Sequence, residues 1–128
     1  MGNQVTNIGG VLSAVTNTIA YTDSSAVTVG TIPANAQIVD VNIDVTTAFN
    51  AATTNTISVG KSGSAAAYAA ATGVGSAGRA SVASTGVYSA WADVGTAEVA
   101  VTATYAQTGT AASAGAARVT IVYRSPAP

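Results

Sequence analysis

The bulky apolar residues of this sequence are almost all branched at Cβ. Leu occurs once, at Leu12, against 17 Val and 7 Ile, and Thr occurs 19 times. Branching at Cβ restricts the first side-chain torsion and favours extended backbone over helix. The residues that favour helices, Leu, Glu, Lys, Arg and Gln, are scarce. An all-β fold is therefore the leading expectation.

Residues 37–46 (QIVDVNIDVT) form the clearest predicted strand, because apolar and polar positions alternate strictly. Such period-two alternation is typical of a half-buried strand. The same pattern predicts strands at 98–105 and 117–124. The residues predicted to face the core are Val39, Val41, Ile43, Val45, Ile57, Val59, Val99, Val101, Val119, Ile121 and Tyr123. Those predicted to be exposed or at a subunit contact are Asp40, Asn42, Asp44, Arg118 and Arg124.

The rest of the chain predicts further short strands at 11–22, 26–29 and 55–60, and weaker ones at 80–85 and 87–92. Only residues 65–72 (AAAYAAAT) have helix propensity, over about two turns. No helices alternate with the strands, which excludes a parallel α/β sheet. We expect a jelly-roll-like β-sandwich of seven to eight short antiparallel strands with one short helical turn. A closed barrel is the second choice.

A chain of 128 residues predicts one domain over residues 1–128, with residues 1–10 as an extended N-terminal arm. Ala supplies 29 of the apolar residues, and each buries little area. A core of this kind favours association, and we expect a homotrimer. A sufficiently stable monomer is the alternative.

Catalytic chemistry has almost no raw material here, because the chain has no His and no Cys. We therefore expect a non-enzymatic protein without cofactor or metal. Asp40 and Asp44 lie four residues apart on one strand, roughly 13 Å at 3.3 Å per residue, too far to share a proton or one metal. The neighbours Lys61 and Ser62 would point to opposite faces of a strand, which disfavours a Ser–Lys pair.

Residues 73–78 (GVGSAG) match the spacing G-x-G-x-x-G, but no helix is predicted after them, so we interpret the segment as a loop. The four cations, Lys61, Arg79, Arg118 and Arg124, are scattered, which argues against nucleic-acid binding. No apolar run is long enough to span a membrane, and no secretory signal is visible, so we expect synthesis in the cytoplasm.

The bulky aromatic residues outside the regular strand faces are candidates for either core or interface. Trp91 is expected in the core more than at an interface, while Phe49 and Tyr88 are evenly balanced. Together with Arg79, these three form the set of candidate interface residues. Trp91, Tyr88 and Asn50 are also the residues that could bind a glycan.

Residues 30–72 resemble small β-sandwich virion proteins of tailed bacteriophages. The resemblance rests on Gly30, Ile32-Pro33-Ala34, Ala36, Phe49, residues 57–60 and the Ala-rich segment 65–72. It continues weakly to the last strand, 119–123. The low charge of residues 1–10 departs from the pattern and leaves the mode of attachment open.

This resemblance implies a head decoration (cement) protein that binds the major capsid protein on the outer capsid surface and stabilises the shell. The alternative is a receptor- or glycan-binding module of a head fibre or tail.

Overall fold

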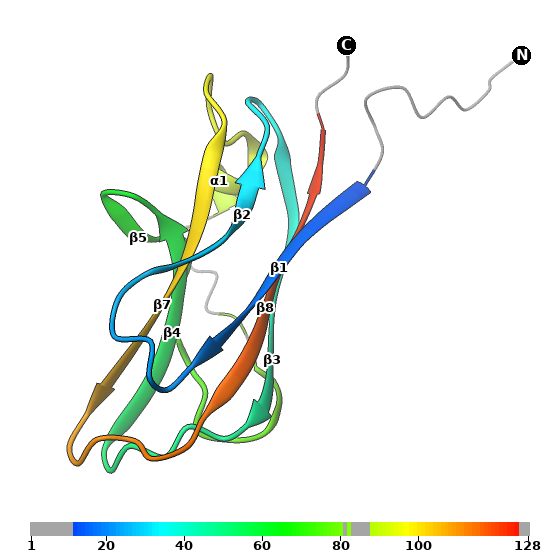
Figure 1. Cartoon of the computed structure of the whole chain (residues 1–128). Coiled ribbons are helices and arrows are strands. Elements are labelled where there is room, and N and C mark those ends of the chain that lie inside the picture. Colours follow the sequence, from blue (N-terminus) through cyan, green and yellow to red (C-terminus); the bar gives the residue numbers. More distant parts are fainter. Residues whose placement is uncertain (1–11, 81, 83–87, 126–128) are drawn as a thin grey trace, which may run out of the picture.

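The computed structural model describes residues 12–80, 82 and 88–125, and the predicted arm at residues 1–10 lies outside them. Figure 1 shows the strands arranged as two facing layers. The elements are β1 Leu12–Ala20, β2 Val27–Ile32, β3 Gln37–Thr47, β4 Thr54–Lys61, β5 Ser64–Gly73, β6 Gly78–Ala80, α1 Tyr88–Ala92, β7 Val99–Thr108 and β8 Ala116–Arg124.

The eight strands form two four-stranded sheets with the orders β1-β8-β3-β6 and β2-β7-β4-β5. Every pairing is antiparallel, and the first strand pairs with the last, the second with the seventh, the third with the sixth and the fourth with the fifth. This nested pairing is that of an eight-stranded jelly roll. The predicted sandwich is confirmed, and the closed barrel is wrong because the two sheets remain separate.

The core lies between the two sheets and is built from alternate residues of the long strands. On β3 and β8, for example, Ile43 and Val119 are fully buried and directly opposite each other. The predicted core residues that are buried are Val41, Ile43, Val45, Ile57, Val59, Val99, Val101, Val119 and Ile121. Tyr123 is half-buried and packs against this cluster.

Val39 is the predicted core residue that the structure places outside. Its side chain is 44% exposed, while Ile38 is buried instead. The register between β3 and β8 shifts between Ile38 and Asp40, which is a β-bulge. A bulge adds one residue to one strand and re-aims a side chain. The alternation that the sequence predicts over 37–46 therefore holds only from Asp40 onward.

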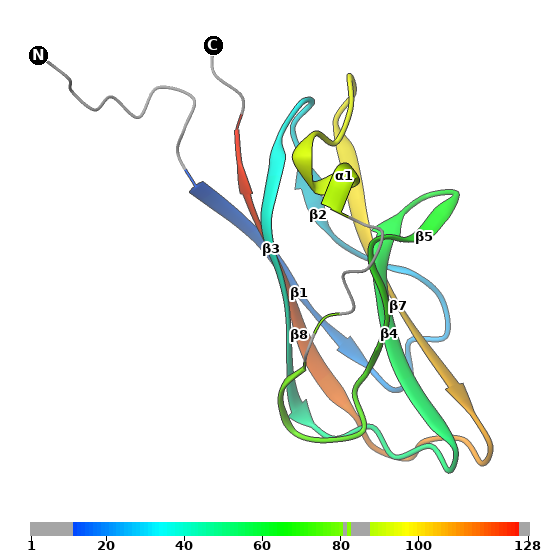
Figure 2. The same cartoon turned by 180° about the vertical axis from the view of Figure 1, so that it is seen from behind.

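Two segments differ in secondary structure from the prediction: the predicted helical turn is a strand, and one predicted strand contains a helix. Residues 65–72 belong to strand β5 and not to a helical turn, because β5 pairs with β4 and buries Tyr68 and Ala69. Tertiary pairing thus overrides the helix propensity of alanine. The five-residue helix α1 lies where a weak strand was expected at 87–92, and it contacts β3 and β5 at one end of the sandwich (Figure 2). Within the described ranges, no helix is long and apolar enough to cross a membrane.

Aspartate side chains close two of the turns. Asp23 accepts a hydrogen bond from the backbone N–H of Ala20 at 2.7 Å, just after β1. Asp93 accepts one from the backbone N–H of Gly95 at 2.8 Å, after α1. Short acidic side chains commonly satisfy backbone donors in this way.

Candidate functional site

Most charged residues of the chain gather on the outer side of the β1-β8-β3-β6 sheet. Because the residues between them on β3 and β8 are buried in the core, these side chains point away from it. We call this surface the charged face, and it carries Asp40, Asp44, Arg79, Arg118 and Arg124. Cations that are scattered in the sequence thus come together on one surface.

Opposite charges lie on neighbouring strands of the charged face. Arg79 donates a hydrogen bond from Nη2 to Oδ2 of Asp40 at 2.9 Å. Asp44 is directly opposite Arg118 on one side and Arg79 on the other. The side chains of Arg79 and Asp40 are 62% and 45% exposed, although Asp40 as a whole residue is half-buried, so water screens the ion pair and it contributes at most about 1 kcal/mol. Asp44, Arg118 and Arg124 are exposed as predicted, whereas Asp40 and Asn42 are half-buried.

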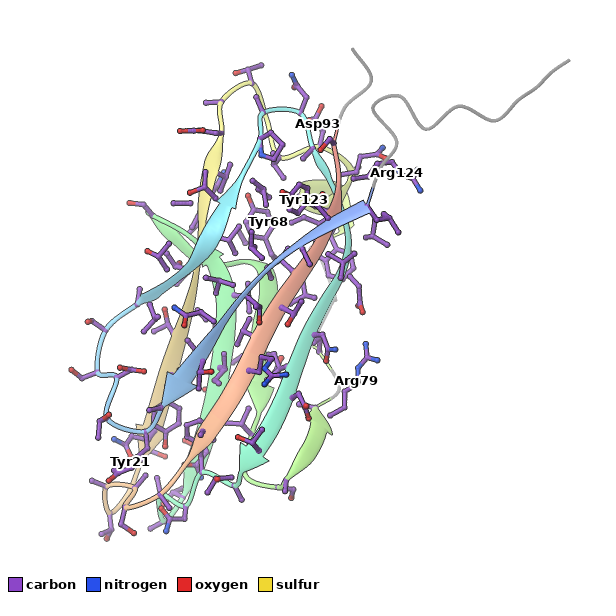
Figure 3. The ribbon with its side chains drawn as sticks, turned by 45° about the vertical axis from the view of Figure 1, so that its right-hand side comes forward. Tyr21, Tyr68, Arg79, Asp93, Tyr123 and Arg124 are labelled. Atoms are coloured by element: carbon purple, nitrogen blue, oxygen red, sulfur yellow. The ribbon has the colours of Figure 1, made fainter. Side chains whose placement is uncertain are left out.

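An apolar patch, which the sequence pattern does not predict, lies at one end of the charged face. Leu12 on β1 is 53% exposed and Val39 on β3 is 44% exposed, and they are the exposed large hydrophobic residues of the described chain. Between them on β8 lies Val122, which is half-buried and paired with both Ala14 and Asp40. We call these four residues, Leu12, Ala14, Val39 and Val122, the apolar patch. Figure 3 shows Arg124 at its edge, near the start of β1.

The structure does not bring the four candidate interface residues together, because only two of them, Tyr88 and Trp91, share an element. Arg79 lies on the charged face, and Tyr88 is the first residue of α1, with its side chain outside the described residues. Phe49 is only 1% exposed and packs on the ring of Tyr105, with ring centroids 4.6 Å apart. Phe49 therefore belongs to the core of this chain.

Trp91 is half-buried and joins α1 to β5. Its Nε1–H donates a hydrogen bond to the backbone oxygen of Tyr68 at 2.7 Å, and its ring packs against the core. Its indole is thus committed largely to holding the helix in place. The side-chain hydroxyl of Tyr68 is buried without a hydrogen-bond partner among the described residues. Burial raises the pKa of this phenol.

A cavity of about 410 Å³ opens between the β4–β5 turn and the start of β7. The backbone of β4 pairs with β7 only as far as Gly60, so the turn between β4 and β5 that follows is not paired with β7. Lys61 and Ser62 line one side, and Thr96 and Glu98 line the other. Lys61 ends β4 and Ser62 lies in the turn that follows, so the alternation of a strand does not extend to Ser62. The cavity offers charges of both signs and hydroxyl groups.

The other candidate motifs have structural roles. Asn50 accepts hydrogen bonds from the backbone N–H groups of Ser113 and Ala114 at 2.8 and 3.0 Å, so its carbonyl oxygen braces a loop. The Gly-rich segment 73–78 runs from β5 into β6 and not into a helix, as expected for a plain loop. Among the described residues, no group of three or more acidic, His or Cys side chains could hold a metal ion.

Comparisons with known proteins support the fold. No family model matches the chain, and no curated protein matches it. A solved structure titled "Cyanophage Pam1 capsid asymmetric unit" contains a similar chain, with a TM-score of 0.70 and 24% sequence identity. The match covers 98% of this chain and 93% of that chain. The two chains are thus nearly equal in length and share this fold from end to end.

Proposed function

We propose that this chain is a structural, non-enzymatic component of a bacteriophage virion. The observation that carries the proposal is the end-to-end likeness to a chain of a cyanophage capsid asymmetric unit. The likeness covers 98% of this chain and 93% of that chain. The absence of His and Cys agrees with this role.

Within the virion, the proposed role is that of a decoration (cement) protein. It binds the major capsid protein on the outer capsid surface as a homotrimer and stabilises the shell, with no nucleic acid or membrane as partner. The mechanism is mass action: a protein that binds the assembled shell but not its separate subunits shifts the equilibrium toward the shell. The proposal takes residues 1–128 as a single domain.

The surface of this chain that best suits a protein–protein contact is the charged face with its apolar patch. Apolar residues surrounded by charges of both signs are typical of protein–protein contacts. The sparse charges of the remaining surface disfavour electrostatic attachment to phosphates.

The test compares virions that contain this protein with virions from which its coding sequence is deleted. We expect the deleted particles to release their genomes at a lower temperature, and purified protein added back to restore the resistance. Equal heat resistance, together with no copies on the shell, contradicts the decoration role. A few copies per particle confined to a fibre or tail would favour the receptor- or glycan-binding alternative.

A further inference from the structure

We infer that the apolar patch is the contact between copies of this chain, with Leu12 of one subunit against Val39 of the next. This inference rests on the homotrimer of the proposed function and adds the surface that forms it. The chain has one Leu, and the fold leaves it half in water. A bulge turns Val39 toward the same face, away from the core that its place in the alternation predicts. Bulges that re-aim a side chain are typical of functional positions.

The charges beside these two residues point to a second copy as the occupant. Leu12 is paired directly with Arg124, which forms no ion pair in the described chain. Val39 directly precedes Asp40 on β3. When Leu12 of one copy lies on Val39 of the next, Arg124 of the first copy approaches Asp40 of the second, where it joins the Arg79 that already pairs with this carboxylate. A contact that joins opposite charges fixes the register of the partners and disfavours misaligned pairing.

The arrangement of the patch favours a closed ring over a two-fold dimer. Leu12 and Val39 lie on opposite sides of β8, on β1 and β3. A contact that joins the β1 side of one subunit to the β3 side of the next uses two different surfaces. Such heterologous contacts close into rings when the rotation fits. Three copies give the proposed trimer, with the charged faces toward the three-fold axis.

Cysteine cross-linking tests the contact cleanly because the chain has no Cys. Leu12 and Val39 lie two strand spacings apart within one copy, about 10 Å, which is beyond the Cα separation of a disulfide. A disulfide between Leu12→Cys and Val39→Cys must therefore join two copies. We expect the double variant to give a covalent trimer under mild oxidation on a non-reducing gel. Each single variant should stay uncross-linked, and an equimolar mixture of the two should give dimers only.

A pair of exposed residues on the other sheet serves as the control. Thr28→Cys on β2 and Thr54→Cys on β4 lie on opposite sides of β7, next to Thr102 and Thr108 of that strand. This double variant should give no defined cross-linked species. In parallel, Leu12→Ser and Val39→Ser should each weaken self-association at least about tenfold in sedimentation, with unchanged circular dichroism.

The outcomes separate the inference from the proposal on which it rests. A wild-type protein that sediments as a monomer at all concentrations overturns the preformed homotrimer, and the inference with it. A wild-type trimer that neither cross-links through positions 12 and 39 nor responds to the Ser variants overturns the inference alone. Cross-linking that stops at a covalent dimer in the double variant overturns the ring. Loss of shell binding in Ser variants that still form trimers assigns the patch to the capsid protein instead.

Discussion

Gly115 lies flat against the ring of Phe49, just before β8 begins. A Cβ at position 115 would lie 2.6 Å from Cγ and 2.9 Å from Cε2 of that ring. The backbone φ of Gly115 is +151°, in a region that side chains rarely adopt. Position 115 therefore admits no side chain for two independent reasons, and the loop between β7 and β8 closes on the buried aromatic pair of Phe49 and Tyr105.

Gly115→Ala should lower the free energy of unfolding by about 2 kcal/mol or more, through the clash and the backbone conformation. Urea unfolding measures the change. Gly73→Ala is the matched control, because a Cβ there meets nothing within 4 Å and its φ is ordinary. The control should be neutral or slightly stabilising. Equal losses at both positions would contradict the close contact with Phe49.

Ile43→Ala should lower the free energy of unfolding by about 2–5 kcal/mol, because Ile43 is fully buried between the sheets and its loss leaves a cavity. Thermal and urea unfolding both measure this change in the free energy of unfolding. The control is Thr18→Ser on the exposed side of β1, which should change stability by about 0.5 kcal/mol or less. A small loss at Ile43 would show that the faces of β3 are inverted.

Asn42→Thr should stabilise the protein by about 1 kcal/mol, because Oδ1 of Asn42 is buried without a hydrogen-bond partner among the described residues. Thr also suits a strand better than Asn does. The same substitution at Asn50 should cost about 1 kcal/mol or more, since it removes the bonds to the N–H groups of Ser113 and Ala114. Urea unfolding should show that the first substitution raises the free energy of unfolding and the second lowers it. Losses at both positions would argue that Oδ1 of Asn42 has a hydrogen-bond partner.

The two buried tyrosines should respond differently to loss of the hydroxyl at pH 7. Tyr105 donates a hydrogen bond to Oδ1 of Asn55 at 2.6 Å, whereas the Tyr68 hydroxyl has no partner in the described part of the chain. Tyr105→Phe should therefore cost about 1 kcal/mol, and Tyr68→Phe should be neutral or stabilising. Differential scanning calorimetry of the two variants decides this, and an equal loss at both would refute it.

Stability should fall above about pH 10, the ordinary pKa of tyrosine in an unfolded chain. Burial raises the pKa of Tyr68 and Tyr105 in the folded state. Above pH 10 the unfolded chain then loses protons that the folded chain keeps, so unfolding becomes easier as pH rises. Urea unfolding between pH 8 and 11 measures the slope. Tyr68→Phe should have a shallower slope than the wild type, and an identical slope would show that Tyr68 ionises normally when folded.

The periodicity of the sequence determines the class of fold and most of the core. The β-branched residues and the strict alternation around Ile43, Val101 and Val119 predict a two-layer sandwich, and the structure confirms it. Both properties are local, because side chains of a strand alternate whatever the strand pairs with. The turns at Asp23 and Asp93 are equally local, since each aspartate bonds a backbone N–H within three residues.

Only the tertiary structure decides the features that depend on pairing between distant strands. Residues 65–72 are a strand because β4 offers a partner for their backbone, although their own propensity is helical. Val39 is exposed because β3 gains one residue against β8 at the bulge, a mismatch that neither strand encodes alone. The charged face and the apolar patch arise because the jelly-roll order places β1, β8, β3 and β6 side by side. Sequence separation hides such neighbours, since 26 positions lie between Leu12 and Val39 and the strand that joins them comes last in the chain.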